Sequence, residues 1–305
     1  VSVFLPQLVQ LLRADDGGQI RAYLLAAASR SVLYAHMLVC TLSAEGRPPP
    51  EAFTSPAVKR SGWTPPEDTG LWAVADELKG LVWQAMPAEK LERLMAEVAF
   101  FDAVTGVSGR LYPVAKEERK NAAVQFVKEV GPPPRGDLYL PTEPRSRLIR
   151  AIPESASPMQ SAAKVPILVA FEVEKEGSGG GNGGGGEDGE EEREDEEEEE
   201  EEVDGGDSDK LDNVDASAPI SSSSAKKNKN TTTTTTNTIR TTTACIFKVG
   251  DDCRQDVLAL QVIRLLQDSL KKAGVDLFLA PYGVIPTGHE CGIIEVVPDC
   301  RSRAA

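Results

Sequence analysis

The stretch from Ala244 to Arg303 constrains the fold of this chain most, because a strand, a helix and two further strands follow one another closely in it. Ala244–Val249 is a short apolar run that carries one charge. Gly250-Asp251-Asp252 then supplies a turn and an acidic N-cap for a helix. The chain is therefore predicted to pass from a strand directly into a helix.

The predicted helix spans Cys253 to Lys272, and its last turn carries two lysines. Gly274 stands where a left-handed C-terminal cap is wanted. Val275–Ala280 and Ile293–Val297 are β-rich runs, separated by Pro, Gly and Thr, and are predicted to be strands. The helix prediction rests on apolar residues that recur at helical spacing, namely Leu258, Val262, Leu265, Leu266 and Leu270.

Lys248 lies inside the first strand, and Asp256 follows it in the first turn of the helix. Phosphoryl transfer depends on positioning and on neutralising phosphate charge, so it needs a strand lysine aimed at the phosphates and a carboxylate that holds it. A lysine on a solvent-facing strand is the commoner explanation of such a residue. Three neighbouring segments decide between the two explanations: FKVGDDCRQD, LFLAPYGVIPTG and GIIEVVPD. Taken together they are too long to resemble a known protein family by chance.

These three segments, in this order, resemble the small lobe of the phosphatidylinositol 3- and 4-kinases, and the type III alpha 4-kinases are the nearer match. The resemblance implies that Lys248 contacts the ATP phosphates. It also implies that Asp251, Asp256 and Tyr282 line the inner pocket as polar residues.

The strand Ile293–Val297 resembles the hinge of that family. The resemblance implies that the Glu295 carbonyl and the Val297 amide hydrogen-bond adenine through backbone atoms. It places Ile294 at the back of the adenine pocket, although plain core packing explains an isoleucine there equally well.

The segment Ser157–Lys164, SPMQSAAK, lies between two predicted strands, Leu148–Ile152 and Ile167–Val173. In the family this loop covers the ATP phosphates in place of a glycine-rich loop. The resemblance implies that it brings Ser161, backbone amides and Lys164 to the phosphates.

Charge is concentrated in one part of the chain. Its 305 residues have a net charge of -15, and 17 acidic residues against one arginine lie between Glu187 and Asp209. The remainder is close to neutral, which argues against a nucleic-acid partner. The five cysteines form no CxxC pair, so neither a zinc site nor a disulfide framework is predicted. With no secretory leader and no long apolar run, the chain is predicted to be cytosolic and non-spanning, and its start at Val1 suggests a fragment or an incomplete gene model.

Residues 1–105 have a helical pattern throughout, with helices predicted at about Leu71–Met86 and Ala88–Val104. Such helix pairs stack into a solenoid-like domain. LPQLVQLLR, IRAYLLAAASRS and YAHM resemble the last helices of the accessory domain that precedes the kinase in the same family. The resemblance implies protein partners for this helical domain, and His36 is interpreted as a packed or surface histidine.

The predicted organisation is α+β, with an α-helical accessory domain followed by a kinase-like small lobe that has an antiparallel sheet and one packed helix. The accessory domain covers residues 1–105, and the lobe covers 106–173 and 244–305. Residues 174–243, rich in Gly, Glu, Ser and Thr, are predicted to be a disordered insertion. Val173 and Ala244 are therefore expected on adjacent antiparallel strands.

The resemblance implies an enzyme that transfers the ATP γ-phosphate to the 4-hydroxyl of phosphatidylinositol, with ATP and Mg²⁺ as cofactors and peripheral attachment to a membrane, the plasma membrane in this family. Neither His36 nor His289 follows Asp-Arg, and no Asp-Phe-Gly occurs. The catalytic loop and the metal ligands are therefore expected beyond this chain, which by itself is predicted to be inactive. The alternative is a non-catalytic interaction scaffold in which the acidic tract binds a basic partner and the lobe is a relic.

Overall fold

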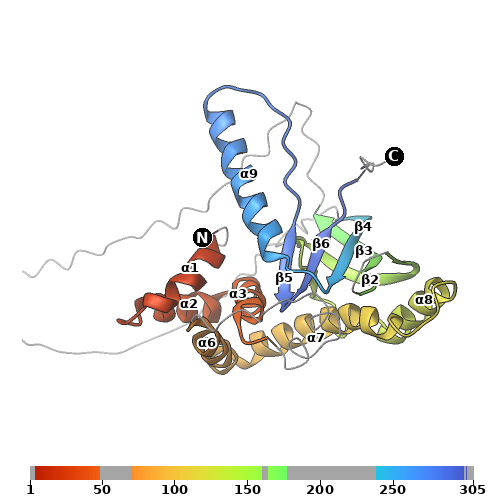
Figure 1. Cartoon of the computed structure of the whole chain (residues 1–305), viewed down its shortest axis with the longest axis horizontal. Helices are drawn as coiled ribbons and strands as arrows, with labels where there is room; N and C mark the ends of the chain where they lie inside the picture. The colour runs from red at the N-terminus through yellow and green to blue at the C-terminus, as the bar shows by residue number, and fades with distance from the viewer. Residues whose placement is uncertain (1–3, 49–69, 160–163, 177–237, 299, 301–305) are drawn as a thin grey trace, which may run out of the picture. The chain divides into compact units, whose positions relative to one another are not determined.

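A computed structural model describes residues 4–48, 70–159, 164–176, 238–298 and 300 (Figure 1). The described helices and strands belong to one compact unit, made of residues 1–177 and 238–305. Most of the predicted insertion, residues 177–237, lies outside the described residues, as does Ser161. No helix among the described segments is both long and apolar enough to cross a membrane.

The helical region contains α1 (Leu5–Leu11), a 3-10 turn η2 (Leu12–Ala14), α2 (Gln19–Arg30), α3 (Val32–Glu45) and α6 (Leu71–Ala85). Pro6 occupies the first turn of α1, where its missing N–H costs nothing. Ser31 caps α3, since its hydroxyl accepts a hydrogen bond from the Tyr34 amide at 3.2 Å. One apolar core joins these helices, and its fully buried leucines include Leu24, Leu38, Leu42 and Leu78.

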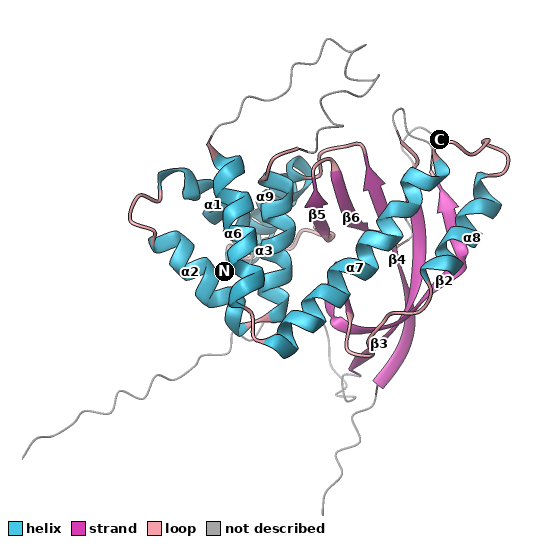
Figure 2. Cartoon of the chain, turned by 90° about the horizontal axis from the view of Figure 1, so that it is seen from below, coloured by secondary structure: helices cyan, strands magenta, loops and turns pink. Residues whose placement is uncertain are grey.

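Helix α7 (Ala88–Leu111) connects the helical region to the sheet. Leu94, near its start, packs in the core of the helical region. Phe101 and Val104, further along, pack in a second core beneath the sheet. Figure 2 shows α7 lying across the sheet, with α8 (Arg119–Val130) beside it. The two cores therefore share one continuous helix.

The sheet is antiparallel, with strand order β1-β2-β3-β4-β6-β5. Its strands are β1 (Tyr139–Leu140), β2 (Glu143–Pro158), β3 (Ile167–Glu176), β4 (Thr238–Val249), β5 (Val284–Gly288) and β6 (Cys291–Glu295). The mixed α+β class with an antiparallel sheet is confirmed. Val173 lies on β3 and Ala244 on the adjacent antiparallel strand β4, as expected.

The centre of the sheet is held by aromatic packing. The rings of Phe171 on β3 and Phe247 on β4 have centroids 5.9 Å apart. Phe101 of α7 lies 6.1 Å from the first ring and 6.4 Å from the second. All three side chains are buried. This aromatic packing anchors one face of β4, and the next residue, Lys248, points to the opposite face.

Strands β3 and β4 are longer than the sequence suggests. Residues 174–176 and 238–243, which the predicted insertion includes, continue the two strands, and Glu176 pairs with Thr238. The polar runs at these positions lack the apolar alternation of a strand. They become strand here because each run finds a partner across the ladder.

The predicted strand Val275–Ala280 is wrong. Val284–Gly288 instead forms β5, because the turn at His289 and Glu290 folds it back against β6. The segment before it has no neighbouring strand, and β-propensity without a partner does not make a strand. Side chains of α9 (Arg254–Lys272) hold this segment alongside the helix, through Gln267 to the Leu279 carbonyl and Arg264 to the Tyr282 carbonyl (Figure 1).

Helix α9 has nearly the expected bounds, and Gly274 caps it with φ of 73°. Its N-cap residue is Cys253, which makes no side-chain cap bond. Asp252 takes the predicted capping role, because its carboxylate accepts the Arg254 amide at 2.9 Å. The apolar periodicity predicted the helix correctly, but Leu258, Val262, Leu265 and Leu266 are exposed.

Candidate functional site

Lys248 lies next to the end of β4, where the chain turns into α9. Alternation along the strand buries Phe247 and directs Lys248 to the other face. Gly250 follows with φ of 84°, a left-handed conformation that suits glycine, and its amide donates to the Glu290 carbonyl. The segment 250–252, called the lysine turn below, therefore brings Asp251 and the start of α9 back toward Lys248.

The structure brings Lys248 together with two of the predicted carboxylates. Its Nζ lies 2.7 Å from Asp251 Oδ2 and 3.8 Å from Asp256 Oδ2. The hydrogen bond to Asp251 raises the pKa of Lys248, so the side chain is an ammonium at neutral pH. The lysine side chain is 27% exposed, which leaves its charge accessible to an anion. Lys248 therefore lies against the carboxylates of Asp251 and Asp256.

The predicted hinge lies at the end of β6, the strand that pairs directly with the Lys248 strand β4. The Glu295 amide donates to the Gly283 carbonyl at 2.8 Å, and the Val296 amide donates to the Ala244 carbonyl at 3.1 Å. Neither bond uses the Glu295 carbonyl or the Val297 amide. Glu295 is held a second time, because its carboxylate accepts the Gly283 amide at 2.6 Å.

Three further predicted residues occupy separate places. Ile294 lies in β6, half-buried between Ile246 of β4 and Val284 of β5. Tyr282 lies just before β5, and its carbonyl accepts from Arg264 at 3.2 Å. Lys164 is exposed, with its Nζ 5.9 Å from the ring centroid of Tyr112.

Arg254, at the start of α9, was not among the predicted site residues. Its guanidinium pairs with Asp252 at 2.8 Å and with Glu45 of the helical region at 2.9 Å. Only the short spacing from Asp252 was visible in the sequence. Glu45 is separated from Arg254 by 209 positions, so no local pattern could have shown the pair.

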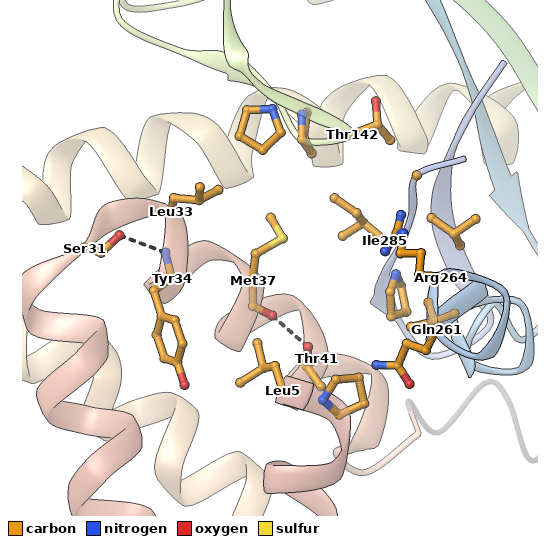
Figure 3. A pocket seen from close by; sticks show the side chains of 17 residues that line it. Leu5, Ser31, Leu33, Tyr34, Met37, Thr41, Thr142, Gln261, Arg264 and Ile285 are labelled. Carbon is orange, nitrogen blue, oxygen red and sulfur yellow. Dashed lines mark hydrogen bonds between the residues drawn. The ribbon is translucent and has the colours of Figure 1, made fainter. Parts of the chain in front are cut away.

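A cavity of about 470 Å³ lies between the helical region, α9 and β5 (Figure 3). Its lining is mainly apolar, and none of the predicted site residues belongs to it. In Figure 3, Leu5 and Met37 lie on the helical side, whereas Gln261, Arg264 and Ile285 lie opposite them. The helical region and α9 are therefore not close-packed along this face.

A buried polar cluster lies where α3 and α7 meet β1. His36 Nδ1 lies 2.7 Å from the Tyr139 hydroxyl, and Glu97 accepts the Tyr139 amide at 3.3 Å. Burial lowers the pKa of His36 to about 4 and raises the pKa of Glu97 to about 8. The cluster joins α3 and α7 to β1, and His36 is a packed histidine, in agreement with its interpretation.

The described part of the chain contains no group of three or more His, Cys, Asp or Glu side chains placed to hold a metal ion. Its five cysteines are free thiols, of which Cys40, Cys245 and Cys253 are buried. The candidate site therefore consists of a lysine with two carboxylates, beside a strand end whose backbone is held in place.

Comparison with known proteins connects this geometry to a protein class. Residues 242–305 match the family model described as phosphatidylinositol 3- and 4-kinase. This match contains the lysine turn, α9, β5 and β6. The chain belongs to the phosphatidylinositol 3- and 4-kinase family.

Three similar proteins within this family are phosphatidylinositol 4-kinases. The chain is 37% identical over 306 residues to phosphatidylinositol 4-kinase alpha 1 of Arabidopsis thaliana, a match that covers 100% of this chain and 12% of the relative. It is 32% identical to phosphatidylinositol 4-kinase alpha 2 of the same plant, over 93% of this chain and 40% of the relative. It is 29% identical to phosphatidylinositol 4-kinase stt4 of Schizosaccharomyces pombe, over 98% of this chain and 14% of the relative. The chain thus spans less than half the length of each of these proteins.

Proposed function

We propose that this chain forms the phosphate-binding side of the ATP site in a phosphatidylinositol 4-kinase, in which the ATP γ-phosphate passes to the 4-hydroxyl of phosphatidylinositol. The observation that carries the proposal is the placement of Lys248 on a rigid strand with Asp251 and Asp256 beside it. A fixed ammonium neutralises phosphate charge, and the carboxylates keep it aimed. Family membership supports this role because it implies ATP as the phosphate donor.

The adenine end of the nucleotide is assigned to the end of β6. The Glu295 carbonyl and the Val297 amide would pair with adenine, with Ile294 behind the ring. The bonds that hold Glu295 to Gly283 fix the strand end, which supports recognition through backbone atoms. We assign Tyr282 to the polar lining near the lysine, and Lys164 with Ser161 to the phosphates.

Mg²⁺ supplies further charge neutralisation when it is bound with ATP. Asp251 and Asp256 have suitable oxygen donors, but both pair with Lys248, and we assign no residue of this chain as a metal ligand. We also assign no transfer step to it, since Asp-Phe-Gly is absent and neither histidine follows Asp-Arg. The 305 residues by themselves are expected to bind nucleotide without turnover.

We propose that residues 1–105 form the end of the helical accessory domain, that 106–173 and 244–305 form the small lobe, and that 174–243 contain an insertion between them. The lipid substrate is phosphatidylinositol, which requires peripheral attachment to a membrane from the cytoplasm. Protein partners are assigned to the helical region.

Photolabelling of the 305-residue chain with 8-azido-ATP tests the nucleotide site. We expect Lys248→Met to lower labelling about tenfold, because a charge-assisted hydrogen bond to a phosphate is lost. Lys272→Met is the matched control, since Lys272 is exposed in the last turn of α9, and it should label as the unsubstituted chain does. Equal labelling of the two variants would refute the assignment.

A non-catalytic interaction scaffold is the second candidate. The exposed apolar residues of α9 favour it, because contiguous exposed apolar surface marks interaction sites. The two candidates differ in one observable. A scaffold predicts no ATP-competable labelling of the chain, whereas the kinase lobe predicts labelling that depends on Lys248.

A further inference from the structure

The start of α9 is joined to the helical region through one guanidinium group. Arg254 donates from Nε to Asp252 Oδ1 at 2.9 Å and from Nη2 to Asp252 Oδ2 at 2.8 Å. Its Nη1 donates to Glu45 Oε2 at 2.9 Å. Asp252 is the neighbour of Asp251, which holds Lys248. The ion pairs Glu45–Arg254, Arg254–Asp252 and Asp251–Lys248 therefore connect the helical region to the lysine, since Asp251 and Asp252 are consecutive residues.

Glu45 occupies a position that is unfavourable for a carboxylate. It is the last residue of α3, where the helix dipole is negative, and its side chain is only 10% exposed. A buried charge in such a place needs a partner, and the Arg254 guanidinium supplies one. Its planar fork is suited to hold two carboxylates at once, which a lysine ammonium does less specifically.

The rest of this interface offers little close packing. The cavity of about 470 Å³ separates α1 and α3 from Val257, Gln261 and Arg264, which lie on the same side of α9 as Arg254. A hydrogen bond from Gln7 Nε2 to Gln261 Oε1, at 2.7 Å, also joins α1 to α9. Because apolar packing is incomplete here, the position of α9 depends strongly on these polar contacts.

Asp256 lies on a different side of the same helical turn, toward Lys248. A helix turn moves as a unit, so a displacement of Arg254 displaces Asp256 and the turn from Gly250 to Asp252 with it. The Gly250 and Asp251 amides, which both donate to the Glu290 carbonyl, report on the order of this turn.

We propose that Arg254 is a positioning residue, which through Glu45 and Asp252 fixes the lysine turn so that the helical region sets the geometry of the phosphate site. Arg254 itself needs no contact with the nucleotide. The inference rests on the proposed function for its meaning, since the site that it positions is the proposed ATP site. The structural coupling that it claims is measurable without any nucleotide.

Hydrogen exchange on the 305-residue chain is the first test. In Glu45→Ala, the amides of Gly250, Asp251 and Arg254 should exchange about tenfold faster, which corresponds to about 1.4 kcal/mol of lost local stability. Glu77→Ala is the matched control, because Glu77 of α6 pairs with Arg21 of α2 at 3.0 Å, so that both partners belong to the helical region. The control should leave these amides unchanged.

Two outcomes of this exchange experiment would overturn the inference. One is unchanged exchange in the turn of Glu45→Ala. The other is an acceleration spread evenly over both cores, which would mark Glu45 as a general stabilising residue. Arg254→Lys provides a graded check, since a lysine reaches one carboxylate at a time, and its effect should fall between those of the unsubstituted chain and Glu45→Ala.

Competition of ATP with 8-azido-ATP labelling is the second test. The ATP concentration for half-competition should rise about tenfold in Glu45→Ala and stay unchanged in Glu77→Ala. If labelling depends on Lys248 but responds to neither helical substitution, the inference is wrong and the proposed function stands. If Lys248→Met labels normally, the proposed function fails, and the exchange experiment still decides whether Glu45 orders the turn.

Discussion

Helices α7 and α9 both border the sheet, but they use their apolar residues in different ways. In α7, Leu94, Val104, Val107 and Leu111 are fully buried, and they divide between two cores. In α9, Leu258 and Leu266 are 56% and 53% exposed, while Leu260 is among the few that are buried. Helical periodicity predicts that a helix forms, but not what covers its apolar face.

The two helices therefore stabilise the chain unequally. Burial contributes about 25 cal/mol for each Å² of apolar surface removed from water. The exposed stripe of α9, made of Leu258, Val262, Leu265 and Leu266, therefore contributes little to stability. What fixes α9 is polar, namely the contacts of Arg254 and Gln261 with the helical region and of Asp256 with Lys248. α7 supplies a well-packed base for the sheet, whereas α9 contributes Asp256, which lies beside Lys248 of β4.

The largest expected effect is at the core beneath α7. Phe171→Ala should lower the free energy of unfolding by about 3–5 kcal/mol, because it empties the space between Phe101 and Phe247. Phe278→Ala is the matched control, since Phe278 follows α9 and is 94% exposed. It should change stability by less than about 0.5 kcal/mol. Urea denaturation measures both, and similar losses would contradict the packing of the two regions.

Gly292 offers the next contrast, because β6 passes close to the start of α9. A Cβ at this position would lie 2.5 Å from Cys253 Sγ and 3.1 Å from the Ile285 carbonyl oxygen. Gly292→Ala should therefore cost about 1–3 kcal/mol through overpacking.

The control for this overpacking is on α7. A Cβ at Gly106 meets nothing within 4 Å, and alanine there should stabilise the helix by up to about 1 kcal/mol. Thermal denaturation of the two variants gives the comparison. A stabilising Gly292→Ala would show that the start of α9 has room to move.

Glu97 on α7 predicts a dependence on pH. Burial raises its pKa to about 8, above its ordinary value, so the folded state retains a proton that the unfolded state loses. Its contribution is fully present below the unfolded-state pKa and declines as pH rises toward 8. Glu97→Gln keeps the acceptor for the Tyr139 amide and carries no ionisable proton.

The Glu97→Gln variant should accordingly gain stability relative to the unsubstituted chain between pH 5 and pH 8. Each pH unit in this window is expected to add roughly 1.4 kcal/mol at most. Denaturation curves at the two pH values measure the difference, and a pH-independent effect would contradict the buried, protonated Glu97.

The smallest effect is expected on the exposed stripe of α9. Leu265→Gln combined with Leu266→Gln should change the free energy of unfolding by less than about 1 kcal/mol, since the two residues are already 47% and 53% exposed. Leu94→Gln on α7 should unfold the chain by comparison, because it buries an unpaired amide. A large loss from the α9 pair would mean that this face is covered in solution.

Several parts of this fold and site are predictable from local sequence. The periodicity after Pro87 predicts that α7 starts at Ala88, although the predicted end at Val104 falls short of Leu111. Gly274 ends α9, and the family segments predict that Lys248 meets a carboxylate of the next helix. These predictions depend on residues close together in the chain, where backbone preferences and spacing decide the outcome. The pairing of β3 with β4 follows as well, because the polar insertion separates two apolar runs.

Contacts between distant residues were decided only by the tertiary structure. Val275–Ala280 has the composition of a strand, yet the place beside β6 belongs to Val284–Gly288, which a tight turn brings there first. The pair Glu45–Arg254 and the buried position of Glu97 leave no local signal, since each depends on how α3 and α7 pack against α9 and the sheet. The sequence by itself determined most of the helices and strands, and it placed Lys248 near Asp256. Which faces are buried, and which charges meet, was settled by packing, because burial is a property of the neighbours that a residue acquires and not of the residue alone.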